Sequence, residues 1–251
     1  DSATTSYQNK DMTFYNLLTG QKTTVSNDDW HMAISMRPSL FPSNTLQGTT
    51  IRMNEAFGAK AYQVPGFTAD SFNVVFDTSS FQVLQKLNDS DSLLDLGALN
   101  AGLNIGVFNY GWGVYAGPPT HNVVGNKVYL IELPGGGIKK FMVQDLVRDT
   151  AWNIKYANLD NSNLQTLNIS KKAYSGKNFV YVNLIDNQIH DKEPLSNNWD
   201  LQFLKYAATD VQAGSIVPQV GVWVNKGVTV AERRGVDVAD NNYSSLQFQP
   251  A

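Results

Sequence analysis

Residues 26–34 read SNDDWHMAI and residues 196–203 read SNNWDLQF, so the chain twice carries a polar run that ends near a tryptophan. In both copies, apolar residues alternate with other residues after Trp30 or Trp199. Ser, Asn and Asp favour turns, and a period of two is typical of a half-buried strand. We therefore predict a turn and a strand in each copy, with each tryptophan in the core. Successive side chains of a strand point to opposite faces, so His31 is expected at the surface, away from Trp30.

The similarity between the copies extends over several strands. Each copy has, in order, an aromatic strand with Asn-Leu, a turn, the tryptophan strand, a loop, a strand that ends in Asn, a glycine and a further strand. The outer parts of the first copy are 13–20, 50–54 and 58–64, and those of the second are 180–185, 222–225 and 227–231. This order predicts a β-meander used twice. We divide the chain into residues 1–171 and 172–251, and the second part either begins a separate domain or packs back onto the first.

Strand patterns also dominate the middle of the chain. β-Branched and aromatic residues at 127–133 and 138–143 flank PGGG at 134–137, which is the pattern of a hairpin. Further stretches of strand-like composition are 152–157, 164–169 and 179–184. Only 81–87 and 92–96 suggest one or two helical turns. We therefore predict an all-β fold, mostly antiparallel sheets and meanders, with one or two short helices.

Composition restricts the classes of protein and partner. The chain has 251 residues, of which 42% are hydrophobic and 16% charged, as is typical of a globular protein with a core. The net charge of −3 gives no basic face for nucleic acid, and no apolar run approaches the length of a membrane span, about 18 residues. Cysteine is absent, which removes disulfides and thiol chemistry. No phosphate-binding loop, nucleophile elbow or dinucleotide fingerprint occurs, so we do not expect an enzyme.

The middle of the chain adds a second set of ordered motifs. YAGPPTH at 115–121 is followed by NKVYLI at 126–131, a Gly-rich turn and IKKFMV at 138–143. Together with the repeated meander, this order resembles the HmuY family, which comprises secreted or surface-anchored all-β proteins of Bacteroidota. The resemblance covers most of the chain, from about residue 12 to residue 238.

The resemblance implies a haem-binding protein, or hemophore, that serves iron acquisition outside the cell or at the outer-membrane surface. It also implies that a TonB-dependent outer-membrane transporter receives the haem. Haem requires axial ligands, usually His, Met or Tyr. One ligand of the haem-binding members precedes the Gly-Pro loop, and that position here is Tyr115. The other lies in an earlier segment, where this chain departs from the family because it has neither His nor Met between Met53 and His121.

Tyr115 ends an aromatic, glycine-rich stretch, GVFNYGWGVY at 106–115. The candidate ligand-binding residues are Phe108, Tyr110, Trp112, Tyr115 and His121, of which Tyr115 and His121 are the candidate ligands of haem iron. Aromatic residues separated by glycines can form a flat slot for a planar ligand or a sugar ring, but the same pattern fits a glycine-kinked strand with core aromatics. No zinc site is expected, because the histidines lack metal-ligand spacing. A second function therefore stays open, namely a surface module of the same fold that binds a glycan or a protein instead of haem.

Overall fold

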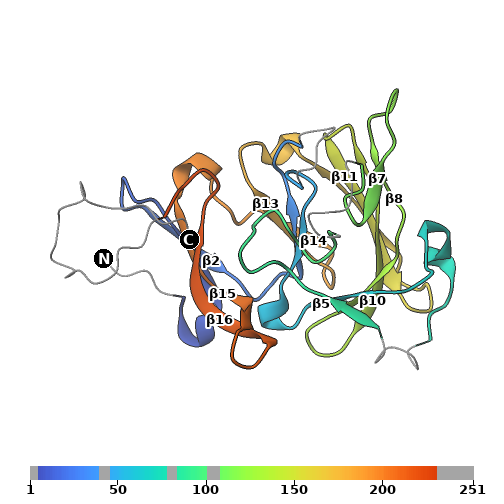
Figure 1. Ribbon diagram of the computed structural model, residues 1–251, viewed down its shortest axis with the longest axis horizontal. Coiled ribbons are helices and arrows are strands. Elements are labelled where there is room, and N and C mark those ends of the chain that lie inside the picture. Colours follow the sequence, from blue (N-terminus) through green and yellow to red (C-terminus); the bar gives the residue numbers. More distant parts are fainter. Residues whose placement is uncertain (1–4, 40–45, 78–83, 101–107, 231–251) are drawn as a thin grey trace.

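The structure is a computed structural model that describes residues 5–39, 46–77, 84–100 and 108–230, and its fold is all-β, as predicted. Three antiparallel sheets lie in a row, with a four-stranded sheet in the middle (Figure 1). In the described residues the helical segments are short 3₁₀ helices: η1 (Tyr7–Asn9), η2 (Glu55–Phe57), η3 (Ala69–Asn73), η5 (Lys172–Tyr174) and η6 (Ser196–Asn198). Within the described ranges, no helix has the length and apolar character needed to cross a membrane.

We name the sheets outer, central and large. The outer sheet has the order β16 (Ser215–Val224), β15 (Leu201–Asp210), β1 (Asp11–Tyr15) and β2 (Lys22–Ser26). The central sheet has the order β14 (Gln188–His190), β13 (Phe179–Asn183), β3 (Met32–Ser35) and β4 (Ile51–Met53). The large sheet has the order β12 (Gln165–Ser170), β11 (Ala151–Asn158), β10 (Ile138–Val147), β9 (Tyr129–Glu132), β5 (Lys60–Gln63) and β6 (Gln85–Leu87). The β7 (Gly113–Tyr115) and β8 (Val123–Gly125) hairpin joins it through β10.

The inner strands of the central sheet, β3 and β13, are buried on both faces, which explains why most of their residues are apolar. On β13, Val180 and Val182 belong to the core shared with the large sheet. Phe179 and Tyr181 alternate with them and belong to the core shared with the outer sheet. Trp30 and Trp199 both lie in this second core, as predicted.

The predicted meander, in which successive strands pair in one sheet, is wrong: the two sequence copies build the outer and central sheets by exchanging hairpins. The first copy supplies the β1–β2 and β3–β4 hairpins, and the second supplies β13–β14 and β15–β16. β1 pairs with β15 in the outer sheet, and β13 pairs with β3 in the central sheet. Each strand of the outer sheet therefore has a counterpart in the central sheet: β16, β15, β1 and β2 correspond, in this order, to β4, β3, β13 and β14. Strands after residue 172 complete sheets that begin before residue 54, and the large sheet is formed by the chain between them.

Equivalent hydrogen bonds follow each copy of the tryptophan motif. Asn54 Nδ2 donates to the carbonyl oxygen of Trp30 at 3.0 Å, and Asn225 Nδ2 donates to that of Trp199 at 2.7 Å. Each asparagine accepts from the backbone amide three residues later, which closes a turn. The asparagine that follows β4 in the first copy, or β16 in the second, therefore links that strand to the tryptophan turn of its own copy.

His31 is buried, with 5% of its surface exposed, so the predicted surface position is wrong. Its Nδ1 accepts the backbone N–H of Leu184 at 2.9 Å. In the other copy, Asp200 Oδ2 accepts the equivalent N–H of Leu17 at 2.7 Å. The alternation rule fails for His31 because this residue lies just before β3, where the backbone N–H of Leu184 needs a hydrogen-bond acceptor. Burial lowers the pKa of His31, which favours the neutral imidazole that can accept.

The remaining predicted elements fall into two groups. The hairpin around the PGGG turn is confirmed, since β9 and β10 pair with Ile138 opposite Glu132. The two predicted helical stretches are wrong: residues 85–87 form β6, paired with β5, and residues 92–96 form turns. Residues 81–83 lie outside the described residues. Residues 228–230 are irregular and do not form the predicted strand, and its last residue, Ala231, lies outside the described residues.

Candidate functional site

The β7–β8 hairpin carries the candidates predicted from the sequence. It packs closely on β10 because Gly125 has no side chain: a Cβ there would lie 1.7 Å from the carbonyl oxygen of Val143. β7 pairs with β8 so that Tyr115 stands opposite Val123. The loop 116–122 between the strands extends from the body of the molecule (Figure 1).

Phe108, Tyr115 and His121 lie together at the base of this loop. Tyr115 Oη forms a hydrogen bond with His121 Nδ1. The rings of Phe108 and Tyr115 stack with centroids 5.7 Å apart and an interplanar angle of 13°. Phe108 is 47% exposed, and His121 is exposed as well. The structure thus brings three of the five candidates into one surface cluster.

Tyr110 and Trp112 are separated from this surface, because both are buried in the core between the central and large sheets. The indole N–H of Trp112 donates to the carbonyl oxygen of Thr49 at 2.8 Å, and its ring packs on Trp152 with centroids 5.1 Å apart. The positions of these two residues agree with the interpretation of the stretch as a glycine-kinked strand with core aromatics. Residues 106 and 107 of the stretch lie outside the described residues.

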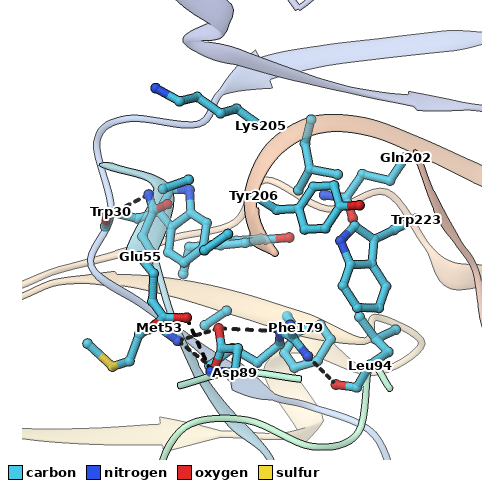
Figure 2. A pocket seen from close by; sticks show the side chains of 17 residues that line it. Trp30, Met53, Glu55, Asp89, Leu94, Phe179, Gln202, Lys205, Tyr206 and Trp223 are labelled. Carbon is cyan, nitrogen blue, oxygen red and sulfur yellow. Dashed lines mark hydrogen bonds and ion pairs between the residues drawn. The ribbon is translucent and has the colours of Figure 1, made fainter. Parts of the chain in front are cut away.

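A second candidate site is a cavity between the outer and central sheets (Figure 2). Its aromatic walls include Trp30, Tyr206 and Trp223. The rings of Tyr206 and Trp223 meet edge to face with centroids 5.6 Å apart. The cavity volume is about 60 Å³, room for a few water molecules. Pockets for small-molecule ligands are typically about 300–1,000 Å³, so this cavity is too small for a porphyrin.

The charged residues of the cavity mainly hold a neighbouring loop in place. The guanidinium of Arg52 donates to the main-chain oxygens of Ser90, Leu93, Leu94 and Leu96. Asp89 accepts the backbone N–H of Met53, and Glu55 accepts that of Asp89 (Figure 2). Asp89 also accepts the backbone N–H of Ala98. These bonds fasten residues 89–98 to β4 and η2, which is a structural role.

Burial changes the acidity of both carboxyl groups. It raises the pKa of Asp89 to about 7, and it also raises the pKa of Glu55. No sequence pattern predicts this cluster, because its members are far apart along the chain and nothing in the polar run at 88–91 indicates burial.

Among the residues that the structure describes, no three His, Asp or Glu side chains are grouped so as to hold a metal ion. A scan against protein-family models, a search of the curated proteins and a search of the solved structures each found no match to this chain.

Proposed function

We propose that this protein is a non-enzymatic, HmuY-like binding protein that takes up haem through Tyr115. The observation that carries the proposal is the hydrogen bond between Tyr115 Oη and His121 Nδ1 beside an exposed loop. Tyrosine is one of the residues that bind haem iron axially. An imidazole that is already hydrogen-bonded to the phenol can accept its proton when the oxygen binds ferric iron. Tyr115 would therefore be the iron ligand and His121 the group that takes the proton.

Phe108 supports the same proposal, because its exposed ring offers apolar surface to the ligand. Its ring is stacked on Tyr115 and is 47% exposed. A porphyrin bound at Tyr115 Oη would cover apolar surface of this ring, and burial of such surface stabilises a complex by about 25 cal/mol per Å². The cavity between the outer and central sheets is the weaker candidate for haem, because of its small volume.

The proposal includes a location and a partner, both of which come from the family resemblance. The protein would act outside the cell or at the outer-membrane surface and pass haem to a TonB-dependent transporter. Digestion of the protein on intact cells by an added protease would support the location, whereas protection until the cells are lysed would contradict it.

A glycan is the second candidate ligand, and the stacked pair of Phe108 and Tyr115 favours it. An exposed, flat aromatic face is suited to a sugar ring, and such a module needs no iron ligand. In this case Tyr115 would act through its ring and not through its hydroxyl group. A protein partner that packs on the same aromatic face belongs to the same alternative.

The decisive experiment is a titration with haemin followed in the Soret region. We expect a saturable shift at micromolar haemin, strong weakening in Tyr115→Phe, which keeps the ring and removes the oxygen, and a smaller loss in His121→Ala. Tyr7→Phe is the matched control, because Tyr7 is 86% exposed and lies in η1, outside the site. Absence of a saturable shift would reject haem as the ligand.

The glycan alternative predicts a different set of results. Tyr115→Phe would keep binding to a glycan array, whereas Phe108→Ala and Tyr115→Ala would lose it. A protein that binds haemin through Tyr115 Oη and binds no glycan would reject this alternative.

A further inference from the structure

Arg148 holds the loop that carries His121. It follows β10 in the turn to β11, and its Nε and Nη2 donate to the carbonyl oxygens of Thr120 and Pro119, both at 3.0 Å. The backbone N–H of Arg148 donates to Asn122 Oδ1 at 3.1 Å. The guanidinium is thus attached to the residues that immediately precede His121, at the edge of the proposed haem site.

No carboxylate among the described residues forms an ion pair with Arg148, and its side chain lies at an exposed position. The neighbouring carboxylate, Asp149, is used elsewhere: it pairs with Lys171 and accepts from the backbone N–H and hydroxyl group of Ser39. The Nη1 group of Arg148 forms no hydrogen bond within the described part of the chain. A positive charge with free donors is therefore bound to the loop residues that precede His121, the hydrogen-bond partner of Tyr115.

We propose that Arg148 binds an anionic group of the ligand, so that the site selects a planar ligand that carries a carboxylate, as haem does in its propionates. Arginine suits this task because its planar guanidinium forms charge-assisted hydrogen bonds to carboxylates. The inference rests on the proposed function and adds to it that the edge of the ligand carries a carboxylate. The loop bonds of Nε and Nη2 orient the guanidinium, and Nη1 supplies the donors for the ligand.

The test compares haemin with its dimethyl ester, which has the same iron and ring but no carboxylates. For the unmodified protein we expect haemin to bind about tenfold more tightly than the ester, which corresponds to about 1.4 kcal/mol. In Arg148→Met both should bind with equal affinity. Lys172→Met is the matched control, because Lys172 is an exposed cation in η5, and it should keep the preference for haemin.

The ratio of the two affinities separates ligand binding from loop positioning. If Arg148 only positions the loop, Arg148→Met weakens haemin and ester equally and leaves the ratio unchanged, which overturns the inference. Equal binding of haemin and ester by the unmodified protein also overturns it. Failure of both to give a Soret shift rejects the proposed function and the inference together.

Salt provides a measurement that needs no variant. Added sodium chloride should weaken haemin binding by the unmodified protein and leave ester binding unchanged, because salt screens exposed charge pairs. Equal salt dependence for the two ligands would contradict the inference even if Arg148→Met fails to fold.

Discussion

Asn54 and Asn225 bind the equivalent tryptophan turns, so substitution of either should destabilise the protein to a similar extent. Both side chains are buried, and each Nδ2 donates to two main-chain oxygens. In Asn54→Ala or Asn225→Ala these carbonyl groups lose their partners, which costs about 2 kcal/mol. Urea denaturation should show this loss in the free energy of unfolding. Asn168→Ala, at an exposed position, is the control and should change it by less than about 0.5 kcal/mol.

Glu193 should make stability depend on pH. It is 2% exposed and accepts the backbone N–H groups of Asn178 and Phe179 and the indole N–H of Trp199. Burial raises its pKa from 4.5 to about 7 in the folded protein. A raised pKa means that the folded state holds the proton more firmly. The contribution to stability is therefore complete below about pH 4.5 and is lost as the pH rises through 7.

The variant Glu193→Gln isolates this contribution, because other titrating groups cancel between it and the unmodified protein. We expect the variant to lose more stability at pH 5 than at pH 7.5, with a difference of about 2 kcal/mol. Urea denaturation at the two pH values measures it. The same stability difference between variant and unmodified protein at both pH values would show that Glu193 titrates normally.

His31 illustrates at the same scale what residue patterns miss. Period-two alternation describes which way a side chain points from an isolated strand, and it predicts a surface position for His31. In the folded chain β13 pairs with β3, and this pairing brings the backbone N–H of Leu184 to His31, whose Nδ1 accepts it. His31 and Asp200 share the role of hydrogen-bond acceptor, and residue type alone does not reveal this role.

At the scale of elements, the position of the β7–β8 hairpin depends on Gly125. A Cβ at this residue would overlap the carbonyl oxygen of Val143 in β10. Gly125→Ala should therefore cost about 3 kcal/mol of stability and weaken haemin binding, because the hairpin carries Tyr115. Thermal melting and the Soret titration measure the two effects.

Gly137→Ala is the control for this substitution. The nearest heavy atom to an added Cβ at Gly137 is 4.0 Å away, on Leu133. The substitution should leave both melting temperature and haemin binding nearly unchanged. A Gly125→Ala protein that melts and binds like the Gly137→Ala protein would contradict the close approach of β8 and β10.

Local patterns predicted the elements unequally. The β9–β10 hairpin combines strand residues with a glycine turn, so its signal is contained in one stretch of chain. The segment 85–87 becomes a strand only because β5 offers it an edge, and β5 lies well before it in the chain. Short apolar stretches adopt the structure that their neighbours allow, and a sequence window does not contain those neighbours.

At the scale of the whole molecule, the exchange of hairpins predicts a single cooperative unfolding transition. The outer sheet needs β1 and β15, and the central sheet needs β3 and β13, so neither sheet forms without both ends of the chain. Unfolding followed by tryptophan fluorescence and by far-ultraviolet circular dichroism should give coincident curves.

The single variants extend this test. Asn54→Ala, before the large sheet, and Asn225→Ala, after it, should each move the whole transition to lower urea concentration. Two separate transitions, of which Asn225→Ala moves only one, would instead indicate that residues 172–251 unfold as an independent domain.

Local sequence patterns predict the all-β class, the repeated order of strands around Trp30 and Trp199 and the identity of the aromatic candidates, because period-two alternation and turn residues act over a few neighbouring positions. How the copies combine and which candidates meet depend on contacts that exist only in the folded chain. The inner strands of the central sheet face the large sheet on one side and the outer sheet on the other. The pairing of β7 with β8 brings Tyr115 to His121, while packing between sheets buries Tyr110 and Trp112. Contacts between distant segments depend on that packing, which no local pattern encodes.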